Sequence, residues 1–264
     1  MYEFYTTQYR IYVAWALQYR FVLALWALAG LTETLVSLAV WQAVARASGG
    51  TVDGYDQSQF AAYFVVVMLV NELTHGWVYW TWEWRVNEGL FSSRLLQPIH
   101  PLHGDIIDNL AVKTVSLVIK VPIALAIASV FDAAFTTDWV HLLALVPALA
   151  MAFLLRMLIE ASLACSAFWL TRISALVNAY YMVWAFTSGQ FAPLELLPSQ
   201  LETVANVLPF RWALAFPVEV ALGRNSDSDV AIGLACQAGW IVITYAMFRL
   251  LWRCASHRYS AVGS

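Results

Sequence analysis

Long apolar runs separated by short polar segments recur through this chain, and they limit the folds that it can form. Runs rich in Leu, Ala, Val and Trp extend from Phe21 to Trp252. Several of them reach the roughly 20 apolar residues that a helix needs to cross the hydrocarbon core of a bilayer. Only 12% of the residues are charged, roughly half the share in a soluble domain. The sequence therefore predicts an all-α, polytopic membrane protein.

Six membrane-spanning helices fit the apolar runs best. We expect them near residues 21–46, 59–83, 112–131, 139–170, 173–190 and 229–252. No segment between them reaches the roughly 50 residues of a small soluble domain, so residues 1–264 are predicted to form one membrane domain. A cleavable signal peptide is not expected, because the first apolar run is too long and lacks a following small-residue cleavage site.

Basic residues predict that both termini are cytoplasmic, because Lys and Arg accumulate on the inner side of a membrane. With the N-terminus inside, the outer segments hold only Arg46, Arg211 and Arg224. The inner segments then hold nine basic residues, namely Arg10, Arg20, Arg85, Arg94, Lys113, Arg172, Arg249, Arg253 and Arg258. Lys120 and Arg156 fall inside predicted spans and are not counted.

The first twenty residues are predicted to form a helix in the inner membrane interface. Aromatic residues recur there at steps of three or four, which places them on one helical face: Tyr5, Tyr9, Tyr12, Trp15 and Tyr19. Such amphipathic rings are favoured at the bilayer surface. The alternative is a simple N-terminal extension of the first span.

The segment from residue 84 to 111 is the longest expected cytoplasmic loop. A short amphipathic helix fits residues 88–96, with Leu90, Leu95 and Leu96 as its apolar residues, and Pro98 and Pro101 prevent its continuation. A helix of this kind on the inner surface is suited to docking a soluble partner. The alternative is an ordinary connector.

The segment 190–223 is predicted to be a re-entrant helical hairpin that enters the membrane from outside. It contains four of the eight prolines of the chain. Ser199 and Glu202 have the spacing of a capping box at the start of a short helix, which Pro209 would end. A second helix could run from about 210 to 222, up to Gly223. Broken backbone at membrane depth requires packing on protein or a water-filled cavity. A loop folded on the outer surface is the alternative.

Charged residues inside the predicted spans are candidates for function. Glu33 and Glu72 lie near the middle of spans one and two, and Arg156 and Glu160 lie four apart in span four, on one helical face. Each such charge costs about 2.5–3.5 kcal/mol on insertion scales, so pairing or hydration is expected. Pairing of Arg156 with Glu160, Glu33 or Glu72 is the favoured interpretation. A place in the substrate path and a proton relay are the alternatives.

Three stretches carry a resemblance to a known family. They are Gln18-Tyr19-Arg20, then Gly89-Leu90 with Leu95-Leu96-Gln97-Pro98, and finally Ser188-Gly189-Gln190-Phe191-Ala192-Pro193-Leu194 with Leu197-Pro198, Leu208-Pro209-Phe210 and Pro217. Together with the order of spans, they resemble the ABC type-2 exporter permeases, most closely the bacterial branch described as viologen or multidrug exporter permeases. The likeness covers essentially the whole chain.

That resemblance implies a transport subunit in the bacterial cytoplasmic (inner) membrane. It implies that residues around 85–100 form the coupling helix on an ABC ATPase dimer, through Gly89, Leu90, Arg94, Leu95, Leu96 and Pro98. It implies an outer hairpin containing Gly189, Pro193, Glu195, Pro198, Pro209 and Phe210, and a second permease chain, identical or related. ATP and Mg²⁺ would bind the partner ATPase, because this sequence has no P-loop motif and no cofactor site of its own is expected.

Two other classes of function compete with the exporter. An ion-coupled secondary carrier would use Glu33, Glu72 and Arg156, but such carriers usually have discontinuous helices in both halves, and only the second half is interrupted by proline. An intramembrane enzyme is disfavoured because no nucleophile or metal motif occurs, and the three cysteines lack metal-ligand spacing. With only two lysines in the chain, no nucleic-acid partner is expected. The expected substrate is a hydrophobic or amphipathic compound such as a drug or a lipid.

The predicted topology can be tested by cysteine labelling in intact cells. In a variant lacking Cys165, Cys236 and Cys254, single cysteines at Gly54 and Ser226 should react with an impermeant thiol reagent from outside. A cysteine at Ser92 should react only after the membrane is opened. Labelling of the Ser92 variant in intact cells would contradict this topology.

Overall fold

The computed structural model is almost entirely helical and describes residues 2–259. Residue 1 of the expected interfacial helix and residues 260–264 of the expected domain lie outside the described residues. The helices are α1 (Tyr2–Gln18), α2 (Arg20–Ala47), α3 (Gln57–Thr74), α4 (Val78–Asn87), α5 (Phe91–Leu95), α6 (Pro101–Val130), α7 (Trp139–Ala164), α8 (Ser174–Thr187), α9 (Ser199–Val207), α10 (Pro209–Ala213), α11 (Ala215–Ala221) and α12 (Asp227–Arg258). Short 3₁₀ helices follow α7 and α8, at Cys165–Phe168 and Leu194–Leu196.

The all-α membrane fold predicted from the sequence is confirmed. Among the described residues, five helical segments are long and apolar enough to cross a membrane: Arg20–Ala47, Gln57–Asn87, Pro101–Val130, Trp139–Phe168 and Asp227–Arg258. The candidate for the sixth crossing, α8, has 14 residues, about 21 Å at the usual helical rise. A crossing by α8 therefore stays a prediction.

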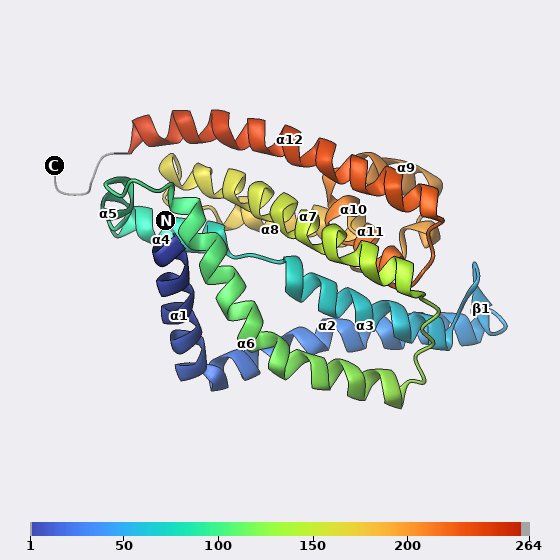
Figure 1. The fold of residues 1–264 in the computed structure, drawn as a ribbon. Coiled ribbons are helices and arrows are strands. Elements are labelled where there is room, and N and C mark those ends of the chain that lie inside the picture. The colour runs from blue at the N-terminus through green and yellow to red at the C-terminus, as the bar shows by residue number, and fades with distance from the viewer. Residues whose placement is uncertain (1, 260–264) are drawn as a thin grey trace.

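The N-terminal helix turns away from the first crossing instead of extending it. Only Tyr19 separates α1 from α2, yet Figure 1 shows α1 lying crosswise to α2. Contacts with α6 hold it there: the hydroxyl groups of Tyr9 and Thr114 lie 2.9 Å apart, and the Tyr5 hydroxyl lies 3.2 Å from Nδ1 of His103. The α1 helix therefore lies across one end of the bundle and does not extend α2.

The third crossing begins earlier than the sequence analysis predicted. Pro101, expected to stop a helix, is the first residue of α6. Proline suits that position because the first helical N–H has no partner in the helix, and its fixed φ is already helical. His100 Nδ1 accepts a hydrogen bond from the N–H of Leu102 and completes the start of the helix. Most of the expected cytoplasmic loop 84–111 is therefore helical: it contains the end of α4, all of α5 and the start of α6.

The second crossing is broken, which the sequence analysis did not foresee. Its predicted range, 59–83, is divided into α3 and α4 by the three residues 75–77. Gly76 allows α7 to pack closely at the break, because a Cβ atom there would lie 2.6 Å from Oε2 of Glu160 and 2.9 Å from the Met157 sulfur, and both side chains would have to move. At its other end, α3 begins beside a two-stranded antiparallel hairpin, β1 (Thr51–Val52) and β2 (Tyr55–Asp56).

Residues 190–223 form a chain of short helices that stays at one end of the bundle. Figure 1 shows α9, α10 and α11 near the end marked by β1, while α5 lies at the opposite end. The longest of them, α9, has nine residues and is too short to cross. That this hairpin enters from the outer side remains a prediction.

Two details of the predicted hairpin are wrong. Ser199 does not cap a helix, because Pro198 occupies the N-cap position and Ser199 is already inside α9. The second helix is not continuous from 210 to 222, since it is divided at Leu214 into α10 and α11. Pro209 begins α10 directly after α9 ends, so it serves as a start and not only as a stop.

The hairpin is held against the long helices by one close approach and one buried amide. Gly233 of α12 lies against the Phe216 ring, and an added Cβ would overlap ring atoms. Nearby, Gln237 is fully buried, and its Nε2 donates to the carbonyl oxygens of Ala148 (3.0 Å) and Trp212 (2.8 Å). The amide therefore links α7, α10 and α12.

Replacing Gly233 should loosen the hairpin. We expect Gly233→Ala to destabilise the fold by about 1–3 kcal/mol, because overpacking forces the Phe216 ring to move. Gly239→Ala is the matched control, since it lies on the same helix with open space around its Cβ position. Thermal unfolding of the two variants in detergent, followed by tryptophan fluorescence, tests this. Equal midpoints would contradict the close packing.

Candidate functional site

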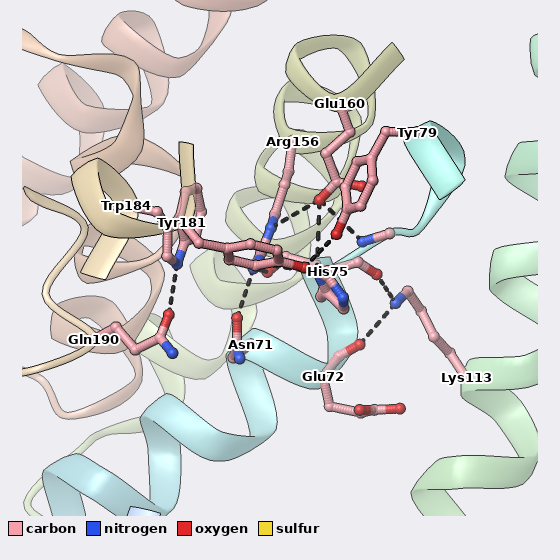
Figure 2. Close-up of polar contacts among 12 residues, drawn as sticks. Asn71, Glu72, His75, Tyr79, Lys113, Arg156, Glu160, Tyr181, Trp184 and Gln190 are labelled. Carbon is pink, nitrogen blue, oxygen red and sulfur yellow. Dashed lines mark hydrogen bonds and ion pairs between the residues drawn. The ribbon is translucent and has the colours of Figure 1, made fainter. Parts of the chain in front are cut away.

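The Arg156 guanidinium is the centre of a polar cluster inside the helix bundle. The side chain extends from α7, and the residue is 1% exposed. Its Nε donates to Oε1 of Glu160 at 3.2 Å, and its Nη1 donates to Oδ1 of Asn71 at 2.6 Å. Its Nη2 lies 3.0 Å from Nδ1 of His75. A guanidinium can only donate, so Nδ1 of His75 accepts. Figure 2 shows these groups converging from three segments of the chain.

An aromatic ring covers the guanidinium on the α8 side. The central carbon of the Arg156 guanidinium lies 3.9 Å from the centroid of a Trp184 ring. Stacking of this kind stabilises a desolvated cation by about 2 kcal/mol. The cluster thus joins α8, the shortest candidate crossing, to α7.

Glu160 bridges Arg156 and the break in the second crossing. Its Oε1 accepts the Arg156 contact and also a hydrogen bond from the N–H of Gly76, at 3.2 Å. Both residues of the predicted Arg156–Glu160 pair are buried, so the carboxylate neutralises the guanidinium where water is excluded. The same carboxylate satisfies a backbone donor that a continuous helix would have paired.

Lys113 satisfies the other side of the break. Its ammonium group donates to the carbonyl oxygen of Glu72 at 2.8 Å and to that of His75. These carbonyls belong to the last turn and C-cap of α3, where helical partners are missing and a cation is favoured. Lys113 is 4% exposed. Counting it as a residue of the inner loop was therefore wrong, and the basic bias becomes eight residues against three.

Two further carboxylates have separate partners. Glu72 forms an ion pair with Lys120, between α3 and α6. Glu33, on α2, accepts a hydrogen bond from Nε2 of Gln190, whose Oε1 accepts from the Trp184 indole at 2.6 Å. Within residues 2–259, Glu33 forms no ion pair, and the residue is exposed. Of the three pairings considered for Arg156, the structure shows the one with Glu160, and no ion pair joins Arg156 to Glu33 or Glu72 among the described residues.

Some of these groups line a cavity of about 360 Å³ between the helices. Its walls are Glu33, Asn71, His75, Arg156, Tyr181, Trp184, Ala185 and Gln190. A polar cavity among apolar helices is the usual sign of a path or binding site for a polar or partly polar molecule. Within the described residues, no group of three or more His, Cys, Asp and Glu could hold a metal ion.

Several residues of this cavity and of the polar contacts around it escaped the sequence analysis. Lys113 and Lys120 lie seven apart and so share one helical face, a spacing that could have revealed them as partners of the acidic residues. Asn71, Trp184 and Gln190 gave no comparable signal. Their positions depend on how α3, α8 and the following loop pack together.

The predicted coupling residues lie far from the cavity, at the α5 end. Leu90, Leu95 and Leu96 are exposed, and Leu96 is 87% exposed. Pro98 is also exposed, Gly89 has a φ of +70°, and Arg94 is partly buried. Phe91, which the sequence analysis did not select, is fully buried and fixes the helix to the bundle.

Two of the predicted hairpin residues contact the bundle directly. The carbonyl of Gly189 accepts a 2.6 Å hydrogen bond from the buried hydroxyl of Tyr63. The Phe210 ring lies 5.8 Å from the Trp184 ring, centroid to centroid, which connects the hairpin to the cavity wall.

Glu195 pairs with Arg224 at 3.4 Å. The prolines stand at helix junctions: Pro193 before the second 3₁₀ helix, Pro198 before α9 and Pro209 at the start of α10.

Removing the Glu160 carboxylate should be strongly destabilising. Glu160→Ala leaves the Arg156 charge and the Gly76 N–H without this acceptor, which costs about 3–5 kcal/mol for a broken buried pair. Glu160→Gln keeps a carbonyl oxygen and should cost less. Glu88→Ala is the control, because it removes an exposed carboxylate directly after α4. The thermal midpoint in detergent measures all three, and a Glu160→Ala midpoint equal to that of the control would refute the bridging role.

Comparisons with known proteins identify the family. A family model described as ABC-2 family transporter protein matches residues 22–263. A search of curated proteins finds no match to the chain. The matched region covers every described helix from α2 to α12, including the polar cavity, α5 and the hairpin. The chain therefore belongs to the ABC-2 family of transporter membrane proteins.

Proposed function

We propose that this chain is the membrane-spanning permease subunit of an ATP-driven exporter for a hydrophobic or amphipathic compound. The observation that carries the proposal is α5, a short helix fixed to the bundle by one face and exposing leucines on the other. A separate ATPase subunit would bind the exposed face, and ATP and Mg²⁺ would bind that subunit.

The buried face of α5 is fixed by aromatic packing. The Phe91 ring lies 5.2 Å from the Trp82 ring and 5.1 Å from the Phe168 ring, centroid to centroid. The hydroxyl of Tyr259, directly after α12, donates to the carbonyl of Gly89 at 3.1 Å. Force on α5 is therefore transmitted to α4, to the 3₁₀ helix that follows α7 and to the residue after α12.

The exposed face of α5 suits a protein groove. Leu90 and Leu96 flank the helix and are exposed together with Leu95. Apolar anchors of this kind commonly contribute about 2 kcal/mol or more each when a partner buries them fully. We propose that these leucines seat on an ATPase dimer, as the family resemblance implies.

The connection from α5 to the cavity is short. α4 ends four residues before α5 begins and starts directly after the break at residues 75–77. His75, in that break, lines the cavity. Movement of α5 would thus reach the cavity through a single ten-residue helix. The cavity offers both aromatic and polar walls, which suits an amphipathic substrate.

The remaining parts of the assembly are inferred from the family resemblance. We propose a second permease chain, identical or related, beside this one, and a location in the bacterial cytoplasmic membrane with both termini inside. The basic residues at the α5 end support that orientation.

An ion-coupled secondary carrier is the second candidate. One observation favours it: the first half of the chain does contain a discontinuous helix, at residues 75–77, with Glu160 and Lys113 at the break. The sequence-based argument considered interruption by proline alone, and this break contains no proline. Transport by the purified chain without an ATPase, driven by an ion gradient, would select this candidate.

The coupling role of α5 can be tested at Leu96. Leu96→Asp should leave the permease folded, because the side chain is 87% exposed, and weaken ATPase binding by about 2 kcal/mol, roughly thirtyfold. The chain is co-expressed with a candidate ABC ATPase subunit, and co-purification and ATP-driven ethidium uptake into inside-out vesicles are measured. Leu95→Asp should act in the same direction.

Leu96→Met is the matched control, because it keeps an apolar side chain of similar size, and it should bind the ATPase as the wild type does. Unchanged co-purification and uptake in both Asp variants would contradict the coupling role. Transport without any nucleotide-binding partner would contradict the exporter.

A further inference from the structure

A second cavity lies at the α5 end of the molecule, away from the polar site. Its volume is about 510 Å³, and it is lined by Trp80, Glu83, Asn87, Thr171, Arg172 and Ser174. One wall is α4, and the other is the connection from α7 to α8 together with the first residue of α8. Figure 1 places α4 beside α5, at the end of the bundle opposite β1. The cavity therefore lies near one surface of the membrane and not at its centre.

The two walls are joined by hydrogen bonds that hold the cavity open at a fixed width. Oε1 of Glu83 accepts from the N–H of Ile173 at 3.2 Å. Nδ2 of Asn87 donates to the carbonyl oxygen of Thr171 at 2.9 Å. Ile173 is fully buried, so it fixes the segment between α7 and α8 to the interior of the bundle. The cavity is a preformed feature of the fold.

The cavity contains one carboxylate and one guanidinium that do not pair with each other. In the part of the chain that the structure describes, neither Glu83 nor Arg172 forms a salt bridge with any residue. The Arg172 residue is exposed, and the second carboxylate oxygen of Glu83 has no hydrogen-bond partner among the described residues. Opposite charges held apart in one cavity suit a ligand that carries both signs.

The surroundings of the cavity have the character of a membrane interface. Trp80 is 45% exposed, and Trp84, one turn further along α4, is also exposed. Tryptophan is favoured at the level of lipid headgroups because its ring is apolar and its N–H is polar. Leu170 and Leu176, on either side of Arg172, are exposed as well. An acyl chain thus has an apolar surface directly beside the charged groups.

We propose that this cavity binds the headgroup of a phospholipid that carries both a phosphodiester and a primary ammonium group, as ethanolamine phospholipids do. Arg172 binds the phosphate, since a guanidinium matches phosphate oxygens with two parallel hydrogen bonds. Glu83 accepts hydrogen bonds from the ammonium group. A free phosphate ion would satisfy Arg172 but leave a like charge, Glu83, in the same cavity.

The consequence is a lipid contact on α4, the helix that connects α5 to the polar site. A lipid held between α4 and the start of α8 stabilises the spacing of α8, which lines the polar cavity, and α4, which begins at the break beside that cavity. The inference is independent of the exporter assignment, because it requires only the two walls and a bilayer.

Lipid retention by the purified chain tests the proposal. The chain is reconstituted in nanodiscs with ethanolamine or choline phospholipid at equal anionic content, and retained lipid is counted by native mass spectrometry after detergent transfer. The wild type should retain ethanolamine lipid preferentially, because a trimethylammonium group has no N–H to donate to Glu83.

Two variants separate the two contacts. Glu83→Gln keeps the acceptor for Ile173 and should remove the preference for ethanolamine over choline lipid. Arg172→Gln should reduce retention of both lipids, by roughly tenfold or more for loss of a charge-assisted hydrogen bond. Arg253→Gln, which removes an exposed charge at the same end of the molecule, is the control and should change neither.

Three results would overturn the proposal. They are equal retention of the two lipids by the wild type, an Arg172→Gln variant that behaves like the Arg253→Gln control, and displacement of the lipid by millimolar inorganic phosphate. The last result would assign the cavity to a free anion.

Discussion

The buried charge of Arg156 is the constraint on which the rest of the structure depends. A cation at membrane depth must be neutralised and fully hydrogen-bonded, or the helix that carries it does not insert stably. Here Glu160 supplies the negative charge, Asn71 and His75 accept hydrogen bonds, and Trp184 stacks on one face of the guanidinium. These partners come from α3, α7, α8 and the break in the second crossing, so satisfying one charge determines how those elements meet.

The break at residues 75–77 follows from the same chemistry. Non-helical backbone at membrane depth is tolerated only where its polar groups find partners in the protein. Glu160 accepts from Gly76, and Lys113 donates to the carbonyls of Glu72 and His75, so both sides of the break are satisfied by side chains. The helix direction therefore changes between α3 and α4 without exposing unpaired backbone groups to lipid. The polar cavity lies at this junction, because His75 of the break lines it.

The α4 helix therefore connects three features of the molecule. One end adjoins the cavity, the other leads into α5, and its side carries Trp80 and Glu83 of the second cavity. Aromatic packing around Phe91 makes the α5 end rigid, and the hairpin contacts through Phe210 and Gly233 make the opposite end rigid. The α5 end and the hairpin end are thus each held by packing contacts, and the polar cavity lies between them.

The sequence by itself determined the all-α membrane fold, the approximate places of five long apolar helical segments, the short helix after the second of them and the proline-interrupted short helices of residues 190–223. These features depend on local quantities: the length of an apolar run, helical periodicity and the backbone restrictions of proline. It also indicated the Arg156–Glu160 pair, because four-residue spacing places two side chains on one helical face. The break at Gly76, the roles of Lys113 and Lys120, and the separation of Glu33 and Glu72 from Arg156 were decided only by the tertiary structure. They depend on which helix faces which, and in a bilayer every neighbouring face is similarly apolar, so hydrophobicity alone does not select the partners.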